Sequence, residues 1–135
     1  MYAIEINLVA VIIATVLAQA VGFLWYSPVL FGKRWMSLMG ISNESKKGMG
    51  KIFVISILSS LIMSYVMAHF VILLVITTIS KAVMLAIWVW AGFIATVTVH
   101  DFLWGSIKPK ELYFLNNGQH LASLVVMTLA LFYFL

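Results

Sequence analysis

Four long apolar stretches divide this sequence of 135 residues, at about 6–26, 52–74, 77–104 and 112–135. At 1.5 Å per residue, an α-helix of about 20 residues crosses the roughly 30 Å hydrocarbon core of a bilayer. Charged residues make up only 9% of the chain. A soluble domain has about 25%, so this chain has too few charges to cover a water-facing surface. The sequence therefore predicts an all-α membrane protein, a single transmembrane domain (1–135) with four transmembrane helices.

The boundary between the second and third stretches is weakly marked, because no Pro or Gly lies between Ile52 and Ser80. Thr77, Thr78 and Ser80 are the residues there whose side chains are able to cap a new helix. We therefore expect the turn near 74–78.

Basic residues gather in two connecting segments and predict an orientation. The first of these segments holds Lys33, Arg34, Lys46, Lys47 and Lys51, and the second holds Lys108 and Lys110. With four spans these segments share one side of the membrane, and Lys81 alone lies opposite. Because cytoplasmic loops carry the excess of Lys and Arg, we expect both segments in the cytoplasm and both termini outside.

A short amphipathic helix is predicted at 28–39, directly after the first stretch. Ser27 suits its N-cap, Pro28 its first position and Gly40 its C-terminal stop. Lying in the headgroup plane, it presents Lys33 and Arg34 to water. Four aromatic residues fall at the same interface, as in the aromatic belts of membrane proteins: Trp25, Tyr26, Trp35 and Trp104. This interfacial helix either binds lipid or a partner, or serves only as an anchor.

The string WYSPVLFGKRWMSLMGIS at 25–42 resembles the signature of the DUF1761 family of small prokaryotic membrane proteins. The resemblance continues at 49–51, 67–70, 88–93 and 116–118 and covers nearly the whole chain. It implies a multi-pass protein of a prokaryotic inner membrane with four spans. The family's function is unknown, so the resemblance implies no activity and no site residues.

Small residues recur at every fourth position on the first two spans, which keeps them on one helix face. The first span has Ala10, Ala14, Ala18 and Gly22, and the second has Ser56, Ser60, Ser64 and Ala68. Such faces let two helix backbones approach closely. The two stripes pack on each other within one subunit, or one of them packs across a symmetric dimer.

A few polar residues fall within the spans at related depths, toward the predicted cytoplasmic side. They are Gln19, Ser60, Thr96, His100, Asp101, Asn117, His120 and Ser123. One interpretation is a polar funnel open to the cytoplasm, in which the two histidines and Asp101 relay protons or hold a divalent metal. The other is structural: Gln19 bridges helices through hydrogen bonds, and the His and Asp residues mark the interface. The spacing is not that of a defined metal site, so we predict no metal.

The polar and reactive residues that the sequence contains limit the functions that the protein can have. The sequence has no Cys and no glycine-rich phosphate loop, and its first span has no acid deep in the membrane. Proton-coupled cation export and catalysis are therefore disfavoured, and we expect no enzyme and no cofactor. The net charge of +4 suits anionic lipid rather than nucleic acid. The leading hypothesis is a non-catalytic helical bundle, expected as a homo-oligomer, that binds lipid or a partner. The alternative is a small oligomeric channel or transporter.

Overall fold

The computed structural model describes residues 3–41, 49–105 and 110–135, and every regular element among them is a helix. The elements are α1 (Leu8–Trp25), α2 (Gly32–Met39), α3 (Met49–Leu73), α4 (Ile79–Val89), the π-helical segment η1 (Trp90–Ala95), α5 (Thr96–Trp104) and α6 (Lys110–Phe134). α4, η1 and α5 follow one another without a break and form one rod. The all-α prediction is confirmed.

Three helices among the described residues are long and apolar enough to cross a membrane: Leu8–Trp25, Met49–Leu73 and the rod Ile79–Trp104. They correspond to the first three apolar stretches of the sequence. α6 has 25 residues, as many as α3, but its first half carries the polar residues Asn116, Asn117, Gln119 and His120. The chain is therefore a helical membrane protein with three candidate spans, and α6 is not one of the three.

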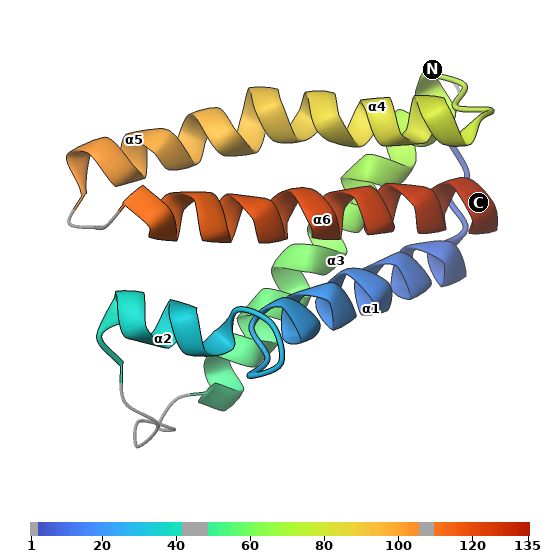
Figure 1. Ribbon diagram of the computed structural model, residues 1–135. Helices are drawn as coiled ribbons and strands as arrows, with labels where there is room; N and C mark the ends of the chain where they lie inside the picture. The colour runs from blue at the N-terminus through green and yellow to red at the C-terminus, as the bar shows by residue number, and fades with distance from the viewer. Residues whose placement is uncertain (1–2, 42–48, 106–109) are drawn as a thin grey trace.

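α6 occupies the centre of the arrangement (Figure 1). It runs beside α1 on one side and beside the α4–α5 rod on the other, while α3 crosses behind them at a steep angle. Both termini lie at one end of the molecule. α2 lies at the other end, near the end of α1 and the start of α6, and we call this the α2 end.

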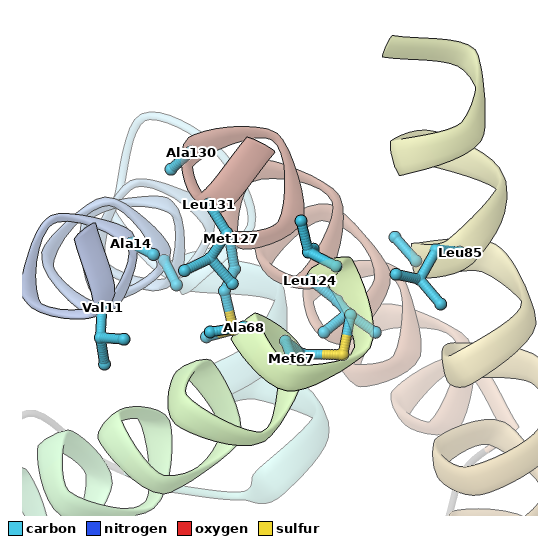
Figure 2. Close-up of a cluster of buried hydrophobic side chains, with 12 residues drawn as sticks. Val11, Ala14, Met67, Ala68, Leu85, Leu124, Met127, Ala130 and Leu131 are labelled. Carbon is cyan, nitrogen blue, oxygen red and sulfur yellow. The ribbon is translucent and has the colours of Figure 1, made fainter. Parts of the chain in front are cut away.

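The hydrophobic core lies in the half of the molecule that holds the termini. Figure 2 shows side chains of α1, α3 and α6 gathered there, among them Ala14, Met67, Ala68, Met127 and Leu131. Leu85 of α4 packs into the same cluster from the far side of α6. The small alanine side chains allow close approach of the helices, and the methionines fill the space between them.

The two small-residue stripes meet only in part. Ala18 of α1 faces α6, because the Ser123 hydroxyl donates to its carbonyl oxygen at 3.2 Å. On α3, the buried Ser64 donates to the carbonyl oxygen of Val11 at 3.1 Å, and its neighbour Ala68 is also buried. Ser56 and Ser60, nearer the α2 end, instead line a pocket. The small-residue stripe of α1 thus packs against two helices, α3 and α6.

The turn between α3 and α4 falls at 74–78, as predicted. α3 ends with hydrogen bonds from Val75 N to Ile72 O (3.1 Å) and from Ile76 N to Val71 O (3.0 Å). This pair of bonds places Val75 in the left-handed region, with φ of 50°, which a β-branched residue rarely adopts. The Thr78 side chain accepts from the backbone N–H of Lys81 at 3.2 Å, so the expected cap is present.

The helix predicted at 28–39 begins later, at Gly32, so its predicted start was wrong. Ser27 does not cap it: its hydroxyl donates to Leu24 O at 2.7 Å, and its carbonyl oxygen accepts from Gly32 N at 2.9 Å. A tight turn over 27–31 therefore precedes α2. The predicted stop is confirmed, because Gly40 ends α2 with φ of 67°.

Candidate functional site

A pocket of about 590 Å³ lies between the second half of α1, the first half of α3 and the middle of α6. It exists because α3 crosses the bundle at an angle and diverges from α6 and the rod toward the α2 end (Figure 1). Gly32, Trp35 and Met36 of α2 also line it. We call this cavity the central pocket. Its volume lies within the range of roughly 300–1,000 Å³ typical of small-molecule sites.

Most of the wall of the central pocket is apolar. Apart from the α2 residues, the larger apolar side chains are Phe23, Met49, Ile52, Phe53, Met63, Ile94, Leu124 and Met127. Leu124 and Met127 also belong to the hydrophobic core, and they place the inner end of the pocket against that core. The pocket is therefore a cavity closed at one end, and this inner end lies against the packed half of the molecule.

Polar side chains form a row within this apolar wall. They are Gln19 of α1, Ser56, Ser59 and Ser60 of α3, and Gln119, His120 and Ser123 of α6. None of the lining residues is Asp, Glu, Lys or Arg. The row offers amide, hydroxyl and imidazole groups, which bind a ligand through uncharged hydrogen bonds.

Some of these polar groups are fixed by hydrogen bonds between helices. The Gln19 amide donates to Ser56 O at 3.2 Å and so joins α1 to α3. The Gln119 amide donates to Ser123 Oγ at 2.8 Å, which in turn donates to Ala18 O at 3.2 Å and joins α6 to α1. The polar row is thus held in place by the same contacts that hold the helices together.

Four of the eight residues predicted for the polar funnel meet in the central pocket: Gln19, Ser60, His120 and Ser123. The other four lie elsewhere. Asn117 is buried and bonds to Thr98 Oγ1 at 3.1 Å, while Thr96 is exposed and donates to Gly92 O at 2.7 Å. His100 and Asp101 are exposed on α5. Within the described part of the chain, no three His, Cys, Asp or Glu side chains form a group that could hold a metal ion.

The sequence reasoning missed Ser59 and Gln119 and assigned Ser56 only to helix packing. Gln119 follows Asn117 and Gly118 in a short polar run, and this run was the available signal. Ser59 lies beside Ser60 on the turn of α3 that faces the cavity, and its role depends on the angle of α3.

α2, three residues of which line the central pocket, is fixed to the start of α6. Arg34 forms a two-pronged ion pair with Glu111, in which Nε donates to Oε1 at 2.7 Å and Nη2 donates to Oε2. This hydrogen-bonded pairing lowers the pKa of the Glu111 carboxyl and raises the pKa of Arg34. Both side chains are about half exposed, so the pair is open to salt and to pH.

The aromatic residues before α2 also contact α6. The Trp25 indole donates to Leu115 O at 3.1 Å, and the Tyr26 hydroxyl donates to Asn116 Oδ1 at 2.8 Å. Trp35 packs edge-on against Tyr26, with ring centroids 5.5 Å apart. Of the predicted interfacial residues, only Lys33 and Trp104 are largely exposed without such contacts among the described residues.

The π-helical segment η1 forms the wall of the rod nearest the pocket, where Ile94 reaches the lining. Its last carbonyl oxygen, that of Ala95, accepts from the Tyr113 hydroxyl at 2.8 Å. π-helical turns leave carbonyl groups short of regular partners and occur often at functional sites. The Tyr113 hydroxyl supplies one such partner from α6.

Comparison with known proteins adds a family but no activity. The chain matches the family described as "Protein of unknown function (DUF1761)" over residues 9–132, a range that includes α1 through most of α6. No curated protein and no solved structure matches the chain.

Proposed function

The chain belongs to the DUF1761 family of proteins of unknown function, and from that premise we propose that it is a four-span membrane protein that binds a lipid-like molecule in the central pocket. The observation that carries this proposal is a row of uncharged polar groups inside an apolar cavity formed by membrane-spanning helices. Such a cavity matches a molecule with a long apolar body and a small polar head.

The fourth span is α6, from Leu112 on. Its 25 residues are enough to cross a bilayer, and the amides of its first half are hydrogen-bonded within the protein. Asn116 accepts from Tyr26, Asn117 bonds to Thr98, and Gln119 donates to Ser123. These pairings remove the cost of placing amides in a membrane.

The α2 end is proposed to face the cytoplasm of a prokaryotic cell, with both termini on the outer side. Lys33, Arg34, Lys51 and Lys110 belong to this end, whereas Lys81 lies at the start of α4 near the termini. This distribution agrees with the excess of basic residues on the cytoplasmic side. Lys46, Lys47 and Lys108 contribute to the same prediction, but they lie outside the described residues.

Binding is preferred to conduction and to catalysis on two grounds. The packed core of Met67, Met127 and Leu131 stands between the inner end of the pocket and the terminal end of the molecule, so the pocket is a cup rather than a pore. In addition, the pocket has amides and hydroxyls but no paired acid and base among its lining residues. The protein is therefore proposed as a non-catalytic binding bundle, and the predicted homo-oligomer remains to be measured by light scattering.

Photolabelling tests the binding site directly. The purified protein in lipid nanodiscs is exposed to single-chain amphiphiles that carry a diazirine on the chain, with a glycerol ester, a sulfonate or a trimethylammonium head. At least one probe is expected to label pocket residues such as Phe53 and Met63. An excess of the unlabelled amphiphile is expected to reduce this labelling. Lipid-facing residues such as Trp88, 72% exposed, are expected to be labelled without saturation.

Two variants make this experiment decisive. Ser60→Trp fills the central pocket and is expected to abolish saturable labelling, whereas Val97→Trp, on an exposed face of α5, is its matched control and is expected to leave the labelling unchanged. The absence of saturable labelling with all three probes would overturn the proposal. Potassium flux in liposomes above the protein-free rate would favour the channel instead.

A further inference from the structure

We infer that the central pocket selects amphiphiles whose head group is uncharged and both donates and accepts hydrogen bonds, such as a glycerol monoester. This inference rests on the proposed function, because it names the ligand class of the same site. It is carried by three features of the pocket: the charge of its lining, the free polar groups in its row and its length along α3.

The lining carries no counter-charge for a charged head. None of the residues that form the pocket is acidic or basic, and Arg34, which precedes the lining residue Trp35, is paired with Glu111. A charged head drawn into an apolar wall without a partner loses its hydration at a large cost. The pocket therefore disfavours both anions and cations.

Several groups of the polar row have hydrogen-bonding capacity left for a ligand. Within the part of the chain that the structure describes, the side chains of Ser59, Ser60 and His120 make no hydrogen bond to another residue. The two histidines outside the pocket differ, since Nδ1 of His69 lies 2.9 Å from Tyr65 O and Nδ1 of His100 lies 2.8 Å from Thr96 O. His120 alone keeps its ring nitrogens for a partner in the cavity.

The free groups are matched to a head that both donates and accepts. Serine hydroxyls and a neutral imidazole each supply a donor and an acceptor, and the Gln119 amide has a second N–H beyond the one it donates to Ser123. A sulfonate would use only the donors, and a trimethylammonium group would use neither. The two hydroxyl groups of a glycerol monoester both donate and accept, so this head satisfies both kinds of group at once.

The pocket is long enough for a chain as well as a head. Its α3 lining runs from Met49 to Met63 along one helix face, about 21 Å at 1.5 Å per residue. On α3, Phe53 and Met63 supply apolar surface on the two sides of the polar residues, and Met127 of α6 adds to it. Flexible methionine side chains adapt to chains of different shape.

Competition between matched amphiphiles tests the inference. The saturable labelling of the pocket by the diazirine glycerol ester is competed with an unlabelled glycerol monoester, an alkyl sulfonate and an alkyl trimethylammonium of the same chain length. The glycerol ester is expected to compete at a concentration at least about tenfold lower than either charged amphiphile. Equal competition by a charged amphiphile would overturn the head-group inference while leaving the binding site intact. The absence of any saturable labelling would overturn the proposed function itself.

Removal of the free groups tests their part in the selection. The double variant Ser59→Ala with Ser60→Ala keeps the cavity but removes two hydroxyls, and it is expected to reduce the preference for the glycerol ester by about fivefold or more. Thr96→Ala removes a hydroxyl that is exposed on α5 and bonded to Gly92 O, so it is the control that should keep the preference. Selection that persists unchanged in the double variant would overturn the assignment to these serines.

Discussion

Gly118 lies directly against the indole ring of Trp25, and a Cβ added to Gly118 would stand 2.8 Å from Cζ2 of that ring. The glycine thus provides the space in which the end of α1 packs on α6. The same indole donates to Leu115 O, one turn earlier on α6.

Gly118→Ala is expected to destabilise the protein by about 1–3 kcal/mol, because the new methyl group pushes the indole away from α6. The loss is measured as a lower midpoint of thermal unfolding in detergent. Gly92→Ala is the matched control, since a Cβ there meets nothing within 4 Å, and it should have little effect or a slight gain. An equal loss in both variants would contradict the packing argument.

Gly32→Ala should release α2 from the bundle. A Cβ on Gly32 would overlap the carbonyl oxygen of Tyr26 and stand 2.8 Å from that of Ser27, and backbone atoms cannot move aside as a flexible side chain does. We expect faster hydrogen exchange throughout 32–39, with the exchange of α4 unchanged. Gly50→Ala, where a Cβ meets open space, controls for the change of residue type. Protection of α2 equal to that of the unmodified protein would refute this expectation.

Val75→Gly should raise stability by about 0.5–1 kcal/mol. Val75 holds a left-handed conformation at the end of α3, and its side chain is 66% exposed, so little packing is lost when the strain is relieved. The gain is read from the unfolding midpoint. Val75→Ala removes the β-branch but keeps a Cβ, so its gain should be smaller, and a larger gain for alanine than for glycine would exclude strain as the cause.

Acid should loosen α2. Because Arg34 lowers the pKa of Glu111 below its ordinary 4.5, the ion pair stabilises the contact above that value. Its contribution is lost as the pH falls through the lowered pKa, when the carboxyl gains a proton. We expect hydrogen exchange of α2 to quicken in that range in the unmodified protein, whereas Glu111→Gln should exchange faster at neutral pH and change little with acid. Identical pH profiles for the two proteins would exclude the ion pair as the cause of the faster exchange in acid.

The sequence was sufficient where a local rule decides the structure. The turn at 74–78 followed from the capping capacity of Thr78, and the end of α2 followed from Gly40. The start of α2 did not follow, because Ser27 bonds back to Leu24 in a turn that brings Gly32 against the carbonyl oxygen of Tyr26.

The sequence predicted the candidate site only through the depth of its residues in the membrane. Gln19, Ser60, His120 and Ser123 were placed at related levels of the membrane, and they do share one pocket. Which residues face one another across the bundle also depends on how each helix is rotated and tilted. The π-helical segment η1 shifts the helical phase, since each added residue rotates the remainder of the rod by about 100°. His100 and Asp101 follow η1 in the chain, and no feature of the sequence predicts this π-helical segment.

The central position of α6 has a consequence for how the protein is made. α6 follows α1, α3 and the rod in the sequence, yet it is the helix around which they are arranged. Ser123 reaches Ala18 across 105 residues of sequence, so this contact forms only after α6 has been synthesised. Until then the apolar character of the earlier helices holds them in the bilayer, and their packing into a bundle waits for α6.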